Sequence, residues 1–357
     1  MTTYDHAVSH ATPTYAVGII GASGYTGAET LRLLAQHPQL ELKVATGDSM
    51  AGSRIADLYP SLAAAYGNRT FDTFSEEGLD GLDLVFCGLP HGVSMGVVPG
   101  VRGRVGHIVD LGSDFRLHDP ALYPEWYGAE HTAPALLDDF VYGLPELFRE
   151  QLRGAELIAA TGCNAATAVF ALAPMLEAGL VEGQGLIVDL VTGVSGAGRP
   201  PKPNTTFCTV DEDVTPYGLL THRHTPEIEQ ALRDRTGVDN TVLFTPHLAP
   251  MNRGIIATCY GRPTQPTTTD EALAALREFY ADEPFMVVDE RPPSTKSTLG
   301  SNTVHLTARV DQRTGLVMTI AALDNLMKGA SGMAVQNANL ALGLEETAGL
   351  PIVGVYP

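Results

Sequence analysis

The chain has 357 residues, of which 44% are apolar and 18% charged, a balance that is typical of globular proteins and predicts two domains at about 150 residues each. Its 22 basic and 41 acidic side chains give a formal net charge of −19, which argues against nucleic acid or an anionic membrane surface as a partner. No apolar run approaches the ~18–20 residues of a membrane span, residues 1–15 lack the features of an export signal, and four scattered cysteines make no disulfide framework, so we expect a cytoplasmic protein.

The first part of the chain predicts alternating strands and helices. Residues 16–20 form an apolar run that ends at a glycine-rich turn, and the apolar spacing after that turn predicts a helix. Thr26 and Glu29 have the spacing of a capping box and predict the start of that helix. Residues 40–44 alternate apolar and polar side chains and close a β-α-β unit. Further short apolar runs predict strands at residues 82–89 and 106–111.

The pattern changes after Cys163, where strand candidates outnumber helices. Residues 268–280 predict the main helix there, and a capping box at Thr268 and Glu271 opens it. Residues 311–315 predict a hairpin turn. This part of the chain therefore indicates an α+β domain with a mainly antiparallel sheet. Its strand candidates are residues 186–191, 241–245, 254–260, 302–310 and 316–323.

The two patterns predict an α/β protein, with a doubly wound Rossmann-type parallel sheet in the first domain and a mainly antiparallel sheet in the second. Residues 329–342 return to a helical pattern that stops at Gly343, and we expect this helix to pack back on the first domain. We therefore assign residues 1–162, completed by residues 328–357, to the first domain and residues 163–327 to the second.

Three glycines form the turn between the first strand and its helix. Their spacing suits a nucleotide-binding turn, because glycines let the backbone approach a pyrophosphate and the following helix supplies free N–H groups and a positive dipole. A tight turn with close helix packing and no ligand is the alternative. The candidate cofactor-binding residues of this turn are Gly21, Ser23, Gly24, Tyr25, Thr26 and Gly27.

The end of the second strand bears on the choice of cofactor. Asp48 stands about twenty residues after the turn, where a carboxylate would bind the ribose hydroxyls of NAD. Ser49, Ser53 and Arg54 follow at once and suit the 2′-phosphate of NADP instead. These residues alone leave the choice open.

Cys163 follows an apolar run, residues 157–160, and stands in the first turn of a helical pattern. A thiol there is close to the positive end of the helix dipole and to free N–H groups, which lower its pKa and favour a nucleophilic thiolate. An inert buried cysteine is the alternative, and we adopt it for Cys87 and Cys259.

His222, Arg223 and His224 place two imidazoles and a guanidinium side by side in the sequence. Such a cluster suits a base and an anion-binding group in one cleft. A zinc site is an alternative, because His-x-His points both rings the same way, but the chain has no second close pair of ligands. An exposed polar turn before a helix at Glu227 is another alternative. His91 is a further candidate base.

Three loops of the second part place a donor-rich side chain beside glycine. This arrangement suits recognition of a phosphate, a carboxylate or the nicotinamide amide, and it also suits an ordinary turn. Arg116 follows a strand of the first domain, where an α/β sheet opens toward its ligand. The loops are residues 195–199 with Ser195 and Arg199, residues 252–254 with Arg253, and residues 324–329 with Asn325.

Together these segments resemble the N-acetyl-γ-glutamyl-phosphate reductases of arginine biosynthesis, a branch of the aldehyde dehydrogenases that includes aspartate-semialdehyde dehydrogenase. The resemblance implies NADPH-dependent reduction of an acyl phosphate to a semialdehyde, in a homodimer or homotetramer joined through the second domain. It also implies that the first domain binds the dinucleotide and the second is catalytic. The resemblance covers Val17 to Pro357 and is carried by residues 21–29, 89–92, 110–116, 195–199, 222–224, 253–254 and 324–329.

The residues and the resemblance agree on a covalent mechanism without a metal. The Cys163 thiolate attacks the acyl phosphate, phosphate leaves, and NADPH reduces the resulting thioester. His222 matches the family's base position, and His224 is the alternative. The candidate substrate-binding residues are Arg116, Ser195, Arg199, His224 and Arg253, and Asn325 is the candidate for the nicotinamide carboxamide.

The sequence departs from the family around the nucleophile. The usual motif is Gly-Cys-Tyr-Pro-Thr, whereas residues 162–167 read Gly-Cys-Asn-Ala-Ala-Thr and are similar to relatives that reduce a substrate tethered to an acidic carrier protein in lysine biosynthesis. A chain of net charge −19 is poorly supplied with basic residues for docking such a carrier, and residues 195–199 follow the arginine-pathway form. We therefore expect free N-acetyl-γ-glutamyl phosphate as the substrate. A carrier-linked aminoadipyl or glutamyl phosphate, or a non-catalytic nucleotide-sensing role, is the alternative.

Overall fold

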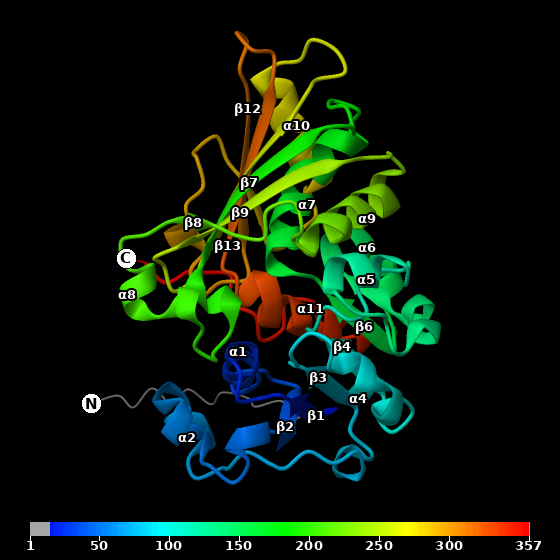
Figure 1. The fold of residues 1–357 in the computed structure, drawn as a ribbon, viewed down its shortest axis with the longest axis vertical. Coiled ribbons are helices and arrows are strands. Elements are labelled where there is room, and N and C mark those ends of the chain that lie inside the picture. The colour runs from blue at the N-terminus through cyan, green and yellow to red at the C-terminus, as the bar shows by residue number, and fades with distance from the viewer. Residues whose placement is uncertain (1–14, 357) are drawn as a thin grey trace, which may run out of the picture.

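The computed structural model describes residues 15–356, so residues 1–14 and Pro357, which fall within the predicted first domain, lie outside the described part. The described strands form two sheets, one for each part of the chain that the sequence distinguishes (Figure 1). Within residues 15–356 no helix combines the length and the apolar character that crossing a membrane requires.

The first sheet has six parallel strands in the order β2-β1-β3-β4-β6-β5. Both of its faces are covered, because Leu84 and Phe86 belong to one apolar cluster whereas Val85 and Cys87 belong to another. The strands that follow β1 lie on opposite sides of it, with β2 on one side and β3 on the other. Open α/β sheets bind ligands at the point where the strand order reverses in this way. The predicted Rossmann-type sheet is therefore confirmed. Its strands are β1 (Tyr15–Ile20), β2 (Leu40–Ala45), β3 (Leu84–Cys87), β4 (His107–Asp110), β5 (Val141–Gly143) and β6 (Leu157–Ala160).

The helix after the glycine turn, α1 (Tyr25–Leu34), begins one residue before Thr26 and has Gly24 as its N-cap, without a side-chain cap. The capping box predicted at Thr26 and Glu29 is therefore wrong. Glu29 is buried and pairs with two arginines, because it lies on the side of α1 that faces the second domain. The other helices before β6 are α2 (Ile55–Leu58), α3 (Ala63–Tyr66), α4 (Ser94–Val101), α5 (Leu122–Tyr127) and α6 (Pro145–Leu152).

The second sheet has seven strands in the order β11-β12-β13-β10-β7-β9-β8. Four of its six strand pairs are antiparallel, and the pairs β11–β12 and β7–β9 are parallel. The mainly antiparallel sheet is confirmed, and β8 and β11, which are too short to show an alternating pattern, are additions to it. Its strands are β7 (Leu186–Gly193), β8 (Thr215–Pro216), β9 (Val242–Ala249), β10 (Ile255–Gly261), β11 (Met286–Val288), β12 (Val304–Val310) and β13 (Val317–Leu323).

Helices pack on one face of this sheet, and the longest of them, α7 (Cys163–Glu177), contacts β10 and β13. The predicted capping box of α10 (Thr269–Phe279) is present, because Thr268 Oγ1 accepts the N–H of Glu271 at 3.2 Å and the Glu271 carboxylate accepts the N–H of Thr268 at 2.8 Å. The hairpin between β12 and β13 is also present. The remaining helices of this part are α8 (Phe207–Val210) and α9 (His224–Thr236).

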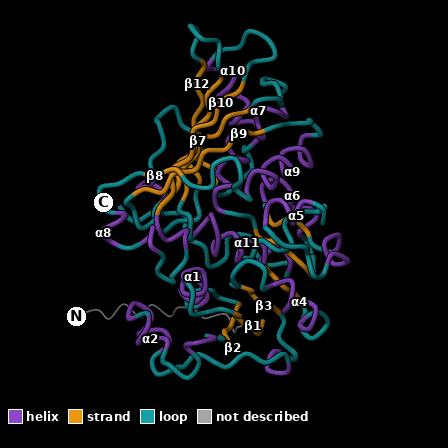
Figure 2. Tube along the Cα trace, in the orientation of Figure 1, coloured by secondary structure: helices purple, strands orange, loops and turns teal. Residues whose placement is uncertain are grey.

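The C-terminal helix α11 (Gly332–Ala341) returns to the first sheet, as predicted. Its Val335 and Ala338 are fully buried in the apolar cluster that contains Val17 and Leu31. Figure 2 shows α11 between the two groups of strands. A single π-helical turn, η8 (Met327–Ser331), leads into it from the second domain.

A buried ion pair fastens this π-helical turn to the first domain. Lys328 and Glu146, on α6, are in direct contact and their side chains have no solvent exposure. The Lys328 ammonium also donates to Gln336 at 2.6 Å and lies over the rings of Phe170 and Phe285. The pair therefore links η8, α6, α7 and α11.

We expect Glu146→Gln to lower the free energy of unfolding by about 3 kcal/mol, because an ammonium group left without its carboxylate in the interior is strongly unfavourable. Urea denaturation measures the change. Glu150→Gln is the matched control on the same helix, since Glu150 is exposed and pairs only with exposed Arg153. Equal loss in both variants would contradict this account of the pair.

Candidate active site

A cleft with a volume of about 720 Å³ lies where the two domains meet. The ends of β1 and β3 form one wall, and the start of α7 and the loops of the second sheet form the others. Ligand sites commonly have volumes of roughly 300–1,000 Å³, so the cleft has the size of a binding site. It is the place where a cofactor on the first domain can meet a substrate on the second.

The glycine turn forms one end of the cleft. Gly21 has a φ of +84°, and a Cβ atom there would lie 2.4 Å from the carbonyl oxygen of Gly88, so glycine is required between β1 and β3. A Cβ atom on Gly27 would lie 2.5 Å from Cα of Ala22, so Gly27 lets α1 pack closely on its strand. Ala28 donates the first in-helix hydrogen bond of α1, which leaves the preceding N–H groups free for a pyrophosphate. The residues of the turn that line the cleft are Gly24, Tyr25 and Thr26.

The end of β2 lies beside this turn, because Ser23 Oγ donates to the carbonyl oxygen of Gly47 at 3.1 Å. Ser49 follows as an exposed residue. Arg54 is also exposed, and its guanidinium pairs with Asp57 at 2.5 Å. Neither Ser49 nor Arg54 lines the cleft.

Cys163 is the first residue of α7 and lines the cleft. The first in-helix hydrogen bond is donated by Ala166 to Gly162, so the thiol stands among free N–H groups, as predicted. Burial nevertheless raises the pKa of the Cys163 thiol to about 11, although the charge of Arg116 lowers it. The predicted lowering of this pKa is thus outweighed by desolvation of the thiolate. A base is needed to remove the proton.

A buried carboxylate, Glu227, lies behind Cys163. Its Oε1 atom accepts the N–H of Gly162 at 2.7 Å and the hydroxyl of Tyr142 at 2.9 Å. Its Oε2 atom lies 3.4 Å from Nη1 of Arg116 and 3.9 Å from Nε2 of His224. This one carboxylate thus binds the N-cap of α7 and an arginine, and it lies beside a histidine.

The imidazoles of His222 and His224 lie with their ring centroids 4.7 Å apart, and both line the cleft. Burial lowers the pKa of His222 to about 4 and that of His224 well below 6.5, so both rings are neutral at pH 7. His222 Nδ1 accepts the backbone N–H of His224 at 3.1 Å, so the neutral His222 ring carries its proton on Nε2. That atom is a hydrogen-bond donor for an oxygen in the cleft.

Cationic side chains line the cleft, and none of the acidic residues in the described part does so. Arg116 is 5% exposed and donates to the carbonyl oxygens of Ala160 and Leu111 at 2.8 and 3.0 Å. Arg223 has a buried Nε atom without a partner among the described residues, and burial together with the charge of Arg116 lowers its pKa. The positive charge of these side chains makes the cleft a site for anions. The cations are Arg116, Arg199, Lys202 and Arg223.

The predicted loops divide into two groups. Ser195 and Asn325 line the cleft and are hydrogen-bonded to each other, with Asn325 Nδ2 donating to Ser195 Oγ at 2.9 Å. Arg199 also lines it, and its Nε atom donates to the carbonyl oxygen of Ser23 at 2.7 Å. Arg253 does not line the cleft, because its guanidinium is held between the carboxylates of Glu29 and Asp324 outside it.

The sequence reasoning missed several residues of the site. Arg223 was visible in the His-Arg-His cluster as a guanidinium, but its free, buried Nε atom follows from tertiary packing. Glu227 gave only the signal of a helix start. Tyr217, whose hydroxyl accepts a hydrogen bond from Asn164 at 3.1 Å, gave none. Among residues 15–356 no group of three histidine, cysteine, aspartate or glutamate side chains is placed to hold a metal ion.

Comparisons with known proteins agree with this arrangement. Residues 16–155 match the family model described as the NAD-binding domain of semialdehyde dehydrogenase, and residues 163–325 match the model of its dimerisation domain. The N-acetyl-γ-glutamyl-phosphate reductase of Symbiobacterium thermophilum is 48% identical over 350 residues, covering 96% of this chain and all of the relative. Those of Jannaschia sp. and Paracoccus denitrificans are 47% and 46% identical, again over 96% of this chain and 99% and 100% of the relatives.

The chain belongs to the N-acetyl-γ-glutamyl-phosphate reductase family. The resemblance seen in the sequence is therefore confirmed, and the chain is an oxidoreductase of the semialdehyde dehydrogenase type. Solved structures share the fold. Aspartate semialdehyde dehydrogenase II of Vibrio cholerae superimposes with a TM-score of 0.70 at 17% identity, over 93% of this chain and 99% of that one. The NADP complex of the Candida albicans enzyme gives 0.68 at 16% identity, over 92% and 99%.

The lowered histidine pKa values predict loss of stability in acid. The unfolded chain takes up protons near pH 6.5, whereas folded His222 stays neutral down to about pH 4, so stability is complete above pH 6.5 and falls as the pH drops toward 4. We expect His222→Asn to reduce this loss by roughly 1–2 kcal/mol at pH 5, measured by urea denaturation at pH 7 and pH 5.

His118→Asn is the control of opposite sign. The hydrogen bond to Asp234 raises the pKa of His118, so protonation of His118 stabilises the fold as the pH falls from 7 to 5. Removal of His118 should therefore enlarge the loss of stability between pH 7 and pH 5. If His222→Asn left the loss between pH 7 and pH 5 unchanged, the neutral His222 of the folded state would be ruled out.

Proposed function

We propose that this chain reduces N-acetyl-γ-glutamyl phosphate to N-acetylglutamate semialdehyde with NADPH and releases phosphate. The observation that carries the proposal is Cys163, placed at the N-terminus of α7 in a cleft that also contains the glycine turn. The relatives that match over their full length are named for this reaction.

Cys163 Sγ would attack the acyl carbon of the substrate and form a thioester as the phosphate leaves. NADPH, when bound, would supply a hydride to that carbon. The resulting thiohemiacetal then breaks its carbon–sulfur bond, which returns the Cys163 thiolate and releases the semialdehyde. Covalent capture divides the reduction into two steps of lower barrier.

His222 would stabilise negative charge and transfer protons at the tetrahedral carbon. Its Nε2–H group can donate a hydrogen bond to the oxygen that becomes negative in each tetrahedral intermediate. To act as the base for Cys163, the ring must give up the hydrogen bond that Nδ1 accepts from His224. The cleft places no acidic side chain of the described residues where it could take this role instead.

The anionic groups of the substrate would bind the cations of the cleft. Arg116, Arg199 and Arg223 supply guanidinium groups for the phosphate and the carboxylate, and Ser195 adds a hydroxyl. Arg223 fits this role best, because its Nε atom has no partner among the described residues. Arg253 is better explained by its pairing with buried carboxylates than by substrate binding.

The cofactor would extend from the glycine turn to Asn325. The free N–H groups at the start of α1 suit the pyrophosphate, and Asn325 suits the nicotinamide carboxamide. Exposed Ser49 and Arg54, which follow β2, suit the 2′-phosphate and favour NADPH over NADH. On this basis residues 1–162 with 328–357 form the dinucleotide-binding domain, and residues 163–327 form the catalytic domain.

We further propose a homodimer or homotetramer that forms through the second sheet. Ile187 and Leu243, at 38% and 47% exposure, alternate with buried residues along β7 and β9 and give the helix-free face an apolar character. This part of the chain matches a dimerisation domain. The four cysteines are all free, which suits a cytoplasmic location.

The deciding experiment is phosphate-dependent oxidation of N-acetylglutamate semialdehyde, followed with NADP and with NAD. We expect activity with NADP and a much lower kcat/KM with NAD. The matched assay uses a semialdehyde linked to an acidic carrier protein. A carrier-linked substrate is the second candidate because Asn164 stands where the usual motif of the family has tyrosine. Activity confined to the carrier-linked substrate would contradict the proposed substrate and retain the chemistry.

Cys163→Ser should lower kcat by several orders of magnitude, because an alcohol has a far higher pKa than a thiol and is a much weaker nucleophile. Steady-state kinetics of semialdehyde oxidation measures the loss. Cys208→Ala is the control, since Cys208 is exposed and does not line the cleft, and it should leave kcat within about twofold. Near-normal turnover by Cys163→Ser would remove Cys163 from the mechanism.

His222→Asn should lower kcat by roughly 10²–10⁴-fold with little change in cofactor affinity, because it removes the group at the tetrahedral carbon. His224→Asn is the comparison, and stopped-flow measurement of both variants separates chemistry from binding. A severe loss in His224→Asn together with a mild one in His222→Asn would exchange the two roles.

A further inference from the structure

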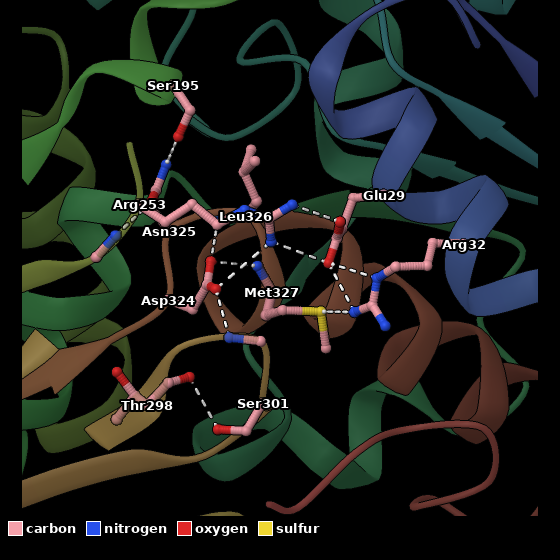
Figure 3. Close-up of polar contacts among 12 residues, drawn as sticks. Glu29, Arg32, Ser195, Arg253, Thr298, Ser301, Asp324, Asn325, Leu326 and Met327 are labelled. Carbon is pink, nitrogen blue, oxygen red and sulfur yellow. Dashed lines mark hydrogen bonds and ion pairs between the residues drawn. The ribbon is translucent and has the colours of Figure 1, made fainter. Parts of the chain in front are cut away.

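Arg253 joins the helix of the glycine turn to the loop that carries Asn325 (Figure 3). Its Nη1 and Nη2 atoms donate to the two carboxylate oxygens of Glu29 on α1, at 3.1 and 2.7 Å. Nη1 also lies 3.5 Å from Oδ2 of Asp324. One guanidinium thus bridges a carboxylate of the first domain and a carboxylate beside Asn325.

The two carboxylates that Arg253 contacts are buried. The side chains of Glu29 and Asp324 are 4% and 0% exposed, whereas Arg253 is 28% exposed. Burial opposes ionisation of Glu29, but hydrogen bonds from Arg253 and Arg32 outweigh it and hold its pKa below the usual value. Glu29 therefore stays charged, and a bidentate pair of this kind is strong and directional.

Asp324 shapes the turn that presents Asn325. Its Oδ1 atom accepts the N–H groups of Leu326 and Met327 at 2.9 and 3.2 Å, and its Oδ2 atom accepts that of Gly300 at 2.8 Å. These contacts fix the backbone on the C-terminal side of Asn325. Arg253 supplies the positive charge that faces this buried carboxylate.

The neighbour of Arg253 fixes the side chain of Asn325. The N–H of Gly254 donates to Asn325 Oδ1 at 2.8 Å, while Asn325 Nδ2 donates to Ser195 Oγ. Gly254 has a φ of +109°, and a Cβ atom there would lie 2.6 Å from Cβ of Thr295, so no other residue fits. The amide of Asn325 is therefore held in one orientation by the segment that contains Arg253.

We propose that Arg253 is a positioning residue for the cofactor: it holds α1 and the Asn325 loop at a fixed separation, so that the pyrophosphate and nicotinamide ends of the dinucleotide bind a preformed site. This inference rests on the proposed function. It gives Arg253 a role through Glu29 and Asn325, without contact to the substrate, which agrees with its place outside the cleft.

The test is the affinity for NADPH, measured by fluorescence titration of the whole enzyme without turnover. We expect Arg253→Met and Glu29→Gln each to raise the Kd for NADPH about tenfold and to lower kcat, with KM for the semialdehyde within twofold of wild type. The Kd of the double variant for NADPH should not exceed the higher of the two single-variant values, because both substitutions remove the same ion pair. Arg253→Lys, which keeps the charge and loses the bidentate geometry, should give an intermediate Kd.

Arg32→Met is the matched control. Arg32 also binds Glu29, at 2.7 Å, and donates to Met327 Sδ at 3.0 Å, but it contacts neither Asp324 nor Asn325, so the Kd for NADPH should stay within twofold. A raised KM for the semialdehyde with an unchanged Kd for NADPH in Arg253→Met would make Arg253 a substrate residue and overturn the inference. Equal effects of Arg32→Met and Arg253→Met would overturn it as well, since the bridge to Asp324 would then be irrelevant.

The test of the proposed function is separate from the test of Arg253. If the wild-type enzyme binds NADPH but does not oxidise N-acetylglutamate semialdehyde, the substrate is wrong and the Kd comparison still decides the role of Arg253. If Arg253→Met does not fold, Glu29→Gln and Arg253→Lys carry the same comparison, because each leaves part of the network in place.

Discussion

A single buried carboxylate, that of Glu227, organises the catalytic half of the cleft. It is fully buried, and the Gly162 N–H, the Tyr142 hydroxyl and the Arg116 guanidinium surround it. Through these contacts α9, which carries His224, is tied to the start of α7, which carries Cys163. The start of α7, Tyr142 and Arg116 are therefore hydrogen-bonded or ion-paired to one carboxylate of α9, and His224 lies 3.9 Å from it.

The cleft combines two demands that conflict. A desolvated thiolate is a stronger nucleophile than a hydrated one, but the same burial raises the pKa of the Cys163 thiol to about 11 and so favours the protonated form. The surrounding cations reduce this conflict, because each favours the thiolate and each also attracts an anionic substrate. Arg116 does both, since its charge lowers the pKa of Cys163 and its side chain lines the cleft.

Features with a local cause could be predicted from the sequence, and features with a distant cause could not. The glycine spacing predicts the β1–α1 turn because Gly21 has a φ of +84° and Gly27 packs against Ala22 within the β-α unit. The position of Cys163 at a helix start likewise follows from the apolar strand before it. The partner of Glu29 could not be predicted, since Arg253 lies 224 residues further along the chain and no periodicity reports which helix faces which loop. The pKa of Cys163 depends on burial by both domains, which outweighs the local helix effect used in the prediction.

The return of α11 to the first domain affects how the chain folds during synthesis. The apolar cluster around β1 includes Val335 and Ala338, so the first sheet lacks part of its core until the ribosome has added nearly the whole chain. Domains usually fold as units in the order in which they emerge. Here the last strand of the second sheet ends at Leu323, so that sheet is synthesised completely before α11. The N-terminal sheet must therefore wait with an exposed apolar face, and that interval is the stage at which chaperone binding would matter most to this protein.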